Sequence, residues 1–144
     1  MKHIYSSLIA MICIAINLSF VSAWATGPEK KEEMGASAKA LFAGGCFWCM
    51  TKPFVLLDGV ASVSSGYAGG TTQHPTYQNY VGGDHIEVVQ IHYDPNKITY
   101  GKLLDTFWRQ IDPTDAGGQF VDRGHAYISA IFTYNDEQRR VAEA

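Results

Sequence analysis

The chain is poor in cysteine and in positive charge, and both shortages limit what it can be. Its 144 residues include 3 cysteines, too few for the dense disulfide network of a small stapled scaffold. Its 11 Lys and Arg residues are outnumbered by 14 Asp and Glu residues, and no basic cluster occurs, which argues against a nucleic-acid partner. No internal repeat is evident, so we do not expect a repeat array.

Residues 1–25 have the features of a secretory signal peptide. A basic start at Lys2 precedes nine apolar residues from Leu8 to Ile16, and cleavage is expected after Ala23 or Ala25, where small residues gather. An uncleaved membrane anchor is the alternative, but the apolar run is short for a span of about 20 residues and polar residues interrupt it. We therefore expect an exported protein, periplasmic or extracellular, with no stable membrane association after cleavage.

The exported chain is expected to form one domain. Removing residues 1–25 takes away Cys13 and Lys2 but no acidic residue, so the formal net charge changes from −3 to −4. The remaining 119 residues suffice for one compact domain and not for two. Residues 26–36 are charged and almost free of apolar side chains, so we expect a flexible lead-in before a folded domain at residues 37–144.

The most informative stretch is Gly-Gly-Cys-Phe-Trp-Cys, residues 44–49. A predicted strand, residues 39–43, runs into it, and an apolar segment that fits a helix follows it to Leu57. Two glycines at such a turn let the backbone bend sharply and let a ligand approach. Cys46 then lies at the first turn of the helix, where unpaired N–H groups stabilise a thiolate. The sequence therefore predicts a nucleophile at Cys46, with a second thiol, Cys49, three residues later.

The rest of the chain alternates between predicted strands and predicted helices. Strands are predicted at residues 60–65, 86–93 and 127–133, helices after Thr99 and after Asn135, and long irregular loops at residues 68–84 and 112–126. The helix after Thr99 has one apolar stripe, which indicates a core-packing face: Leu103, Leu104, Phe107, Trp108 and Ile111. The order β-α-β-β-α-β-α predicts an α/β (α+β) two-layer sandwich. We expect a ferredoxin-like β-α-β-β-α-β core, with an open mixed sheet and helices on one face.

Three polar residues are expected where strands meet irregular loops: Tyr67, Glu87 and Tyr127. Glu87 shares the apolar face of its strand, and a carboxyl group there needs a reason. A thiolate, a half-buried carboxyl group and two phenols form a coherent set. The thiolate attacks, the carboxyl group donates a proton to a developing oxyanion, and the phenols hydrogen-bond the same oxygen. Phe47 and Trp48 add an apolar wall that suits a methyl or thioether group.

The pattern of motifs closely resembles peptide methionine sulfoxide reductases of the A type. The resemblance covers residues 39–144 almost continuously and lies in these segments: Gly44-Gly45-Cys46-Phe47-Trp48, Gly66-Tyr67-Ala68-Gly69-Gly70, Pro75-Thr76-Tyr77, residues 85–89, residues 107–108, residues 111–120, Asp122-Arg123-Gly124, Tyr127 and residues 129–132. The cysteine motif together with the long block at residues 112–124 makes the resemblance highly specific. It implies that residues 37–144 are a methionine sulfoxide reductase catalytic domain.

By position, the resemblance implies a role for each candidate residue. Cys46 matches the family nucleophile, Glu87 the acid, Tyr67 and Tyr127 the phenols that hold the sulfoxide oxygen, Phe47 and Trp48 the cage for the methyl group, and Asp122 a substrate-orienting carboxylate. The reaction it implies turns methionine S-sulfoxide, free or in proteins, into methionine and leaves Cys46 as a sulfenic acid. A second thiol then forms a disulfide that thioredoxin or a similar dithiol reduces. With no later cysteine in the chain, Cys49 is expected to be that thiol. No metal or organic cofactor is implied, and we expect a monomer.

Two other functions remain open at this stage. A C-x-x-C pair in an exported protein also fits a thioredoxin-like dithiol oxidoreductase, although Glu87 and Tyr127 would then have no task. A zinc site is the second alternative, with Cys46, Cys49 and two histidines among His74, His85 and His125 as ligands. The irregular histidine spacing and the Phe-Trp insert fit such a site poorly.

The carboxyl-terminal helix predicted after Asn135 lacks a stop signal. Residues 136–144 contain no glycine, and no loop or polar tail follows them. We therefore expect a reading frame truncated at its C-terminus, in which the segment that relatives carry beyond this point would cover the sheet.

Overall fold

The computed structural model describes residues 37–144, and the expected signal peptide (1–25) and lead-in (26–36) lie outside this described part. The elements in chain order are β1 (Ala38–Gly44), α1 (Phe47–Val55), β2 (Val60–Ala68), η1 (Val81–Gly83), β3 (Ile86–Tyr93), α2 (Tyr100–Trp108), β4 (Gly118–Gln119), β5 (Asp122–Arg123), η2 (His125–Tyr127), β6 (Ser129–Phe132) and α3 (Asp136–Ala142). Within residues 37–144, no helix has the length and apolarity that a membrane span requires.

The main sheet has four strands in the order β2-β3-β1-β6. Every neighbouring pair is antiparallel, with Phe42 of β1 opposite both Val89 of β3 and Ile131 of β6. The expectation of a mixed sheet was therefore wrong. Strands β1 and β2, which α1 connects, run parallel to each other but are not neighbours in the sheet. Strand β3 lies between them and is antiparallel to both.

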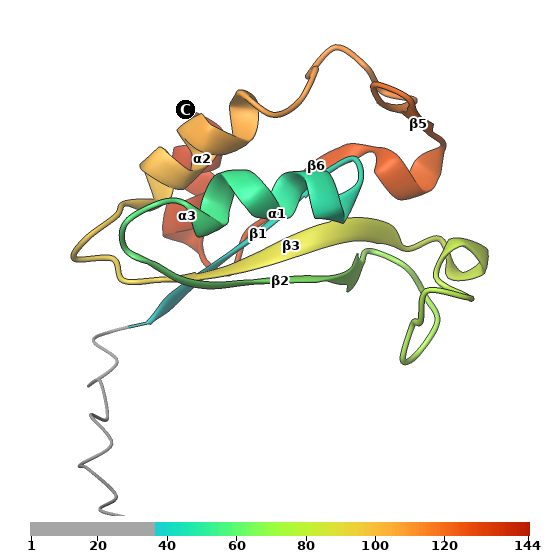
Figure 1. Cartoon of the computed structure of the whole chain (residues 1–144), viewed down its shortest axis with the longest axis horizontal. Helices are drawn as coiled ribbons and strands as arrows, with labels where there is room; N and C mark the ends of the chain where they lie inside the picture. The colour runs from blue at the N-terminus through green and yellow to red at the C-terminus, as the bar shows by residue number, and fades with distance from the viewer. Residues whose placement is uncertain (1–36) are drawn as a thin grey trace, which may run out of the picture. The chain divides into compact units, whose positions relative to one another are not determined.

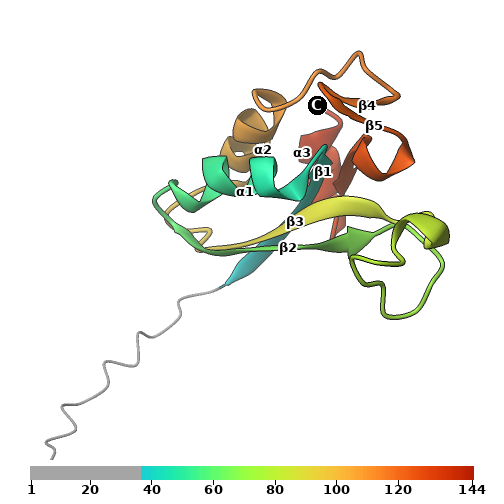
Figure 2. The same cartoon turned by 45° about the vertical axis from the view of Figure 1, so that its right-hand side comes forward.

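All three α-helices lie on one side of this sheet, as the sequence predicts (Figure 1, Figure 2). The core between the layers is built from alternate residues of the strands and the apolar faces of the helices. Its fully buried large side chains include Phe42, Phe54, Val89, Ile91 and Leu103. The fold is thus a mixed α/β structure. Glu87 lies two residues before Val89 in β3, so its side chain points to the same, helix-covered face of the sheet.

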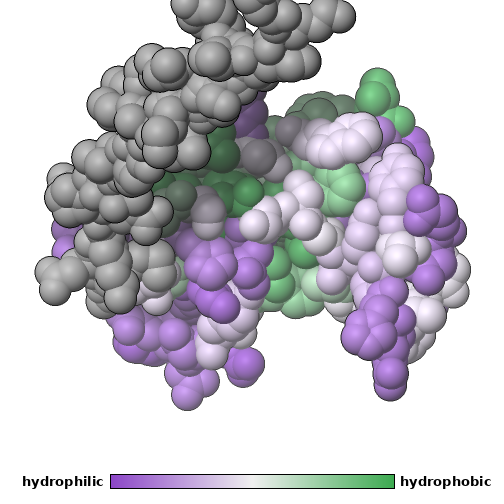
Figure 3. Space-filling model, turned by 60° about the horizontal axis from the view of Figure 1, so that its bottom comes forward, coloured by the Kyte–Doolittle hydropathy of each residue, from purple (hydrophilic) through white to green (hydrophobic). Residues whose placement is uncertain are grey.

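The opposite face of the sheet has a second, smaller apolar cluster. Ala43, Ile86 and Val88 are buried in it, and Phe132 packs against them. The view of this face shows hydrophobic side chains gathered between polar margins (Figure 3). Because strand residues alternate between faces, Glu87 and its two neighbours in sequence lie on opposite sides of β3.

Most predicted elements agree with the structure, and the differences fall at their ends. The strand expected at residues 86–93 has these bounds as β3, and Thr99 caps α2 by accepting a hydrogen bond from the Lys102 N–H at 3.2 Å. Strand β2 continues through Tyr67, beyond the expected end at residue 65. Trp108 was expected in the core but is 46 % exposed, because it is the last residue of its helix.

The segment from residue 112 to residue 133 differs most from expectation. Its loop contains the β4–β5 hairpin, and the strand expected from Tyr127 begins only at Ser129, because Tyr127 lies in the short helix η2. After β6, Asn135 caps α3 through a 2.9 Å hydrogen bond from the Gln138 N–H, as predicted. The Gln138 side chain donates to the Lys39 carbonyl at 2.7 Å and so fixes α3 to the first strand.

Candidate active site

The turn between β1 and α1 has the tight geometry that its two glycines predict. Gly45 has a φ of +89°, in the region that disfavours L side chains. A Cβ atom on Gly44 would lie 2.8 Å from Ile111 Cγ2 and 2.9 Å from Met50 Cε, so this position has no room for a larger residue. Cys46 is therefore delivered by a closely packed turn to the N-cap position of α1.

The two thiols of the motif lie beside each other in one helical turn. The Cys46 carbonyl accepts a hydrogen bond from the Cys49 N–H at 3.0 Å, and both cysteines are free. Cys46 is half-buried and Cys49 is exposed. The pKa of the Cys49 thiol is raised above its ordinary value, first by partial desolvation and then by the adjacent Cys46 and the carboxyl groups of Asp122 and Glu87. Both carboxyl groups are thus close to the pair of thiols.

Glu87 is a buried carboxyl group at the N-terminus of α1. Its side chain is 3 % exposed, and its Oε2 accepts a hydrogen bond from the Phe47 N–H at 2.9 Å. Phe47 follows Cys46 directly, so the carboxyl group lies one residue from the candidate nucleophile. The alternation in β3 predicted this burial correctly, and the helix N-terminus gives a physical reason for it, since the unpaired N–H of Phe47 supplies the buried carboxyl oxygen with a hydrogen-bond donor.

Tyr80 is the phenol that contacts Glu87, and the sequence interpretation missed it. Its hydroxyl donates to Glu87 Oε1 at 2.8 Å, and its side chain is 5 % exposed. The pKa of Tyr80 is raised well above its usual range, mainly by burial and then by the side chains of Tyr127 and Glu87. Tyr80 therefore links the loop at residues 68–84 to the buried carboxyl group of β3. Its position within the irregular loop at residues 68–84 gave no periodic signal that marks it.

The predicted Tyr67 lies next to this group in a packing position. It pairs with Glu87 across β2 and β3, and its ring stacks on that of Tyr80 with 4.5 Å between centroids. The centroid of the Tyr67 ring also lies 5.8 Å from that of the Phe47 ring. Burial is the main cause that raises the pKa of Tyr67, followed by Glu87 and Tyr77.

The expected apolar wall has one buried and one exposed member. Phe47 is 6 % exposed, whereas Trp48 is 69 % exposed, with 5.7 Å between their ring centroids. The Trp48 ring is nearly parallel to that of Tyr77, with an angle of 15° between the ring planes and 6.4 Å between the ring centroids. Trp48 is thus held at the rim of the site between the start of α1 and the loop at residues 68–84.

A buried histidine holds the two ends of that loop together. The Gly70 N–H donates to His85 Nδ1 at 3.3 Å, and His85 Nε2 lies 3.1 Å from the Thr72 carbonyl. Because an amide N–H can only donate and a carbonyl can only accept, the proton of the neutral ring must be on Nε2. His85 thereby fixes the loop that carries Tyr80 to Glu87.

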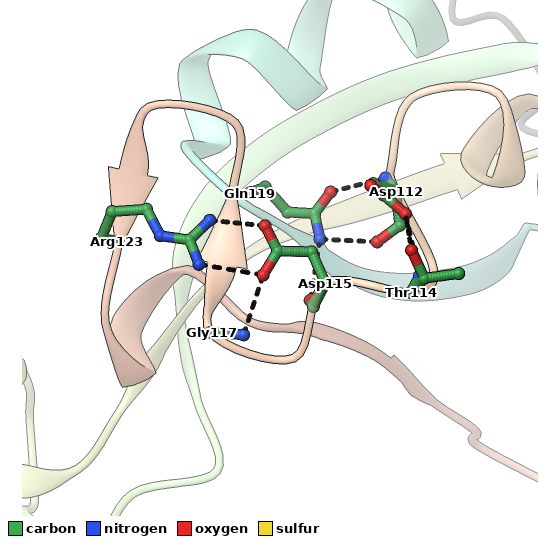
Figure 4. A network of polar contacts seen from close by, with 6 residues as sticks. All are labelled: Asp112, Thr114, Asp115, Gly117, Gln119 and Arg123. Atoms are coloured by element: carbon green, nitrogen blue, oxygen red, sulfur yellow. Dashed lines mark hydrogen bonds and ion pairs between the residues drawn. The ribbon is translucent and has the colours of Figure 1, made fainter.

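The β4–β5 hairpin closes the site on the side of Gly45. Gln119 is 1 % exposed, its side chain exchanges hydrogen bonds with the Asp112 backbone at 2.7 and 3.0 Å, and a Cβ on Gly45 would lie 2.8 Å from Gln119 Cβ. Figure 4 shows this clamp beside the ion pair of Asp115 and Arg123. The predicted Asp122 opposes Gln119 in the hairpin. The sequence singled out Asp122 but neither the hairpin nor the role of Gln119.

The structure groups six of the predicted site residues around the start of α1 and places Asp122 in β5 and Tyr127 in η2; the six are Cys46, Phe47, Trp48, Cys49, Tyr67 and Glu87. The zinc alternative finds no support in the described residues, since residues 37–144 contain no group of three or more His, Cys, Asp or Glu side chains placed to hold a metal ion. A thiol pair, a buried carboxyl group and phenols can together perform nucleophilic attack with proton donation.

Comparison with known proteins finds one family. The family model described as "Peptide methionine sulfoxide reductase" matches residues 38–144. Proteins named peptide methionine sulfoxide reductase MsrA are 56% identical over 106 residues in Bacillus licheniformis and 56% identical over 118 residues in Bacillus subtilis. The matches cover 72% and 81% of this chain but 59% and 63% of those proteins, so the chain spans about three fifths of the length of these relatives.

Solved structures give the same result. Methionine sulfoxide reductase A of Corynebacterium diphtheriae matches with a TM-score of 0.68 and 32% identity, over 74% of this chain and 55% of that one. Mxr1 of Saccharomyces cerevisiae in reduced form matches with a TM-score of 0.67 and 30% identity, over 74% and 67%. The same protein in complex with Trx2 matches with a TM-score of 0.51 and 26% identity, over 74% and 64%.

Proposed function

Because the chain belongs to the peptide methionine sulfoxide reductase family, we propose that it reduces methionine S-sulfoxide to methionine at Cys46. The observation that carries the proposal is the buried Glu87 carboxyl group, held by the Phe47 N–H beside the nucleophile and by the Tyr80 hydroxyl. A thioredoxin-like dithiol oxidoreductase is not favoured, because the family model that matches residues 38–144 is that of peptide methionine sulfoxide reductase.

The reaction follows from the positions of these groups. The Cys46 thiolate attacks the sulfoxide sulfur, while Glu87 donates a proton to the sulfoxide oxygen. Tyr127 hydrogen-bonds to the same oxygen, and Tyr80 hydrogen-bonds to the Glu87 carboxyl group. The attack forms a bond between Cys46 Sγ and the substrate sulfur. The hydroxyl group then moves to Cys46 Sγ as that bond and the original S–O bond break. The products are methionine, reduced by two electrons, and a Cys46 sulfenic acid, oxidised by two electrons. Phe47 and Trp48 supply the apolar wall for the methyl group, and Asp122 orients the substrate from the β4–β5 hairpin.

Cys49 is the thiol proposed to resolve the sulfenic acid. Its sulfur attacks Cys46 Sγ, a disulfide forms, and the hydroxyl group leaves as water after taking up the Cys49 proton. The support is that Cys46, at the N-cap, and Cys49 share the first turn of α1, where the Cys49 N–H donates to the Cys46 carbonyl at 3.0 Å. A thioredoxin-type dithiol then reduces the disulfide by exchange, and the Mxr1 structure in complex with Trx2 makes such a partner reasonable.

The test is reduction of methionine S-sulfoxide by purified protein with dithiothreitol as the electron donor. Cys46→Ser is expected to abolish the activity and to leave the melting temperature close to that of the unmodified protein. If the Ser variant kept a few per cent of the activity, the nucleophile would be elsewhere. Methionine R-sulfoxide in a parallel assay serves as the control for the expected epimer.

We also propose that the core is ferredoxin-like. The support is the strand order β2-β3-β1-β6, the antiparallel pairing and the two helical crossovers on one face. A crystal structure with a different strand order would overturn this assignment.

The cellular location and the oligomeric state belong to the same proposal. The apolar run and small residues at positions 1–25 support export and cleavage after Ala23 or Ala25. N-terminal sequencing of protein from the extracytoplasmic fraction tests this, and a chain that still begins at Met1 in the cytoplasm would contradict it. Light scattering of the purified protein tests the expected monomer.

A further inference from the structure

The β4–β5 hairpin presents two large apolar side chains to solvent next to the candidate active site. Phe120 is 69 % exposed and Val121 is 90 % exposed. Single exposed apolar residues are common, but neighbouring ones indicate a contact surface. Phe120 also has a φ of +53°, a left-handed conformation that is unfavourable for an aromatic residue and that a glycine would adopt freely. The hairpin therefore has a phenylalanine at position 120, where the backbone conformation alone would favour glycine.

The base of this hairpin is rigid, so its tip is a fixed projection. Asp115 forms a two-pronged ion pair with Arg123 and accepts the Gly117 N–H at 3.0 Å (Figure 4). This hydrogen bonding with Arg123 is the main cause that holds the pKa of Asp115 below its ordinary value. Gln119 is tied to the Asp112 backbone on the buried side. A tip mounted on such a base cannot bury its apolar side chains by a simple loop movement.

The hairpin base also borders the two thiols. Gln119 packs on Gly45, the residue before Cys46, and Asp122 is close enough to raise the pKa of Cys49. Phe120 and Val121 are the two residues between Gln119 and Asp122, and a chain of two residues spans at most about 7 Å. The apolar tip therefore belongs to the rim of the site.

A second exposed apolar feature lies where the start of α1 meets the loop at residues 68–84, and both ribbon views place this loop on the other side of the start of α1 from the β4–β5 hairpin (Figure 1, Figure 2). Trp48 is 69 % exposed and Tyr77 is 58 % exposed, and their rings are nearly parallel. Methionine sulfoxide as a free amino acid is too small to contact Cys46 and both apolar features at once. An extended polypeptide spans about 3.3 Å per residue, so residues on either side of an oxidised methionine would reach them.

We propose that Phe120 and Val121, together with the Trp48–Tyr77 pair, form a docking surface for an unfolded polypeptide segment with apolar residues flanking its methionine sulfoxide. This inference rests on the proposed function; Trp48 already belongs to the wall for the methyl group, and the new specificity element is the pair Phe120 and Val121 on the hairpin tip. Its occupant is a polypeptide because the apolar surface extends on two sides of the thiols, whereas the small substrate needs only the wall beside Cys46.

The experiment measures the reduction of two different substrates by the same protein, with dithiothreitol as the electron donor. The substrates are free methionine S-sulfoxide and a peptide of about nine residues with apolar neighbours around one methionine S-sulfoxide. The double variant F120S/V121S is expected to lower kcat/KM for the peptide by roughly tenfold or more and to leave kcat/KM for the free amino acid within about twofold. The matched control is V55S/L56S, which removes two exposed apolar side chains at the far end of α1 and should change neither value.

Three results would overturn the inference. These are an equal loss with both substrates, no loss with either, or a loss that occurs only when thioredoxin replaces dithiothreitol, which would make the hairpin a reductant surface. If the unmodified protein reduces neither substrate, the proposed function fails. Whether the hairpin binds a polypeptide is then tested by a binding measurement instead of an activity assay. In that case fluorescence anisotropy of the labelled peptide with Cys46→Ser must show binding that F120S/V121S in the same background weakens.

Discussion

Removing the Tyr80 hydroxyl tests the arrangement of the site most directly. In Tyr80→Phe the ring keeps its stacking on Tyr67, which has 4.5 Å between centroids, while the 2.8 Å hydrogen bond to Glu87 Oε1 is lost. The change is small and buried, so it isolates one polar contact. Glu87 retains its second partner, the Phe47 N–H.

The size of the effect follows from the kind of bond. Leaving a buried acceptor without its hydrogen-bond partner costs about 1–3 kcal/mol. Because each 1.36 kcal/mol of activation free energy is about tenfold in rate, we expect kcat/KM to fall by roughly 10- to 100-fold. The free energy of unfolding should fall by about 1–3 kcal/mol, which lowers the melting temperature by about 4 °C or more.

The assay is the single-turnover rate of methionine S-sulfoxide reduction in a double-mutant cycle with Glu87→Gln. If Tyr80 acts through Glu87, Tyr80→Phe should have a much smaller effect in the Glu87→Gln background. Tyr134→Phe is the matched control, because its exposed hydroxyl bonds to Gln90 at 2.7 Å at a distance from the site. Additive losses in the cycle, or an unchanged rate in Tyr80→Phe, would refute the reasoning.

Three further perturbations have definite expected results. Glu87→Gln should slow the chemical step by roughly 100-fold or more with little change in substrate binding, since a general acid is lost; an unchanged single-turnover rate would make Glu87 structural. Cys49→Ser should release about one methionine per enzyme and then stop with thioredoxin as donor, as the resolving scheme requires. Mass spectrometry of the unmodified protein should then find a Cys46–Cys49 disulfide after one turnover, and a stable sulfenic acid there would contradict the scheme. Gly45→Ala should lower the free energy of unfolding by about 1 kcal/mol or more, measured by urea unfolding, because its φ is +89° and the added Cβ would meet Gln119 Cβ at 2.8 Å; an unchanged midpoint would show that the turn can relax.

The sequence predicted those parts of the site that depend on local patterns. Alternation over residues 86–93 is enough to place β3 and to bury Glu87, and two glycines before Cys46 are enough to predict a sharp turn into a helix. These features need no knowledge of distant contacts, because the period of a strand and the conformational freedom of glycine act within a few residues.

The parts that were missed depend on contacts between distant segments. Tyr80 reaches Glu87 because His85 closes the loop that carries Tyr80 and because β3 presents Glu87 to it. The β4–β5 hairpin has strands of two residues each, too short for a periodic signal, and is fixed by the Asp115–Arg123 pair and by Gln119. The sheet order likewise follows from which strands pair, which no single segment determines.

The placement of both thiols in one helical turn has a consequence for the stability of the protein during the proposed redox cycle. A disulfide stabilises a fold mainly by restricting the unfolded chain, and the restriction grows with the length of the loop it closes. The loop from Cys46 to Cys49 contains only four residues, for which the chain-entropy relation gives about 2 kcal/mol, against about 4.7 kcal/mol for a loop of 100 residues. Closing this disulfide is therefore expected to raise the free energy of unfolding by less than half of what a 100-residue loop would give. Each cycle of the proposed reaction would then impose a smaller stabilisation for the reductant to reverse than a long-range disulfide would.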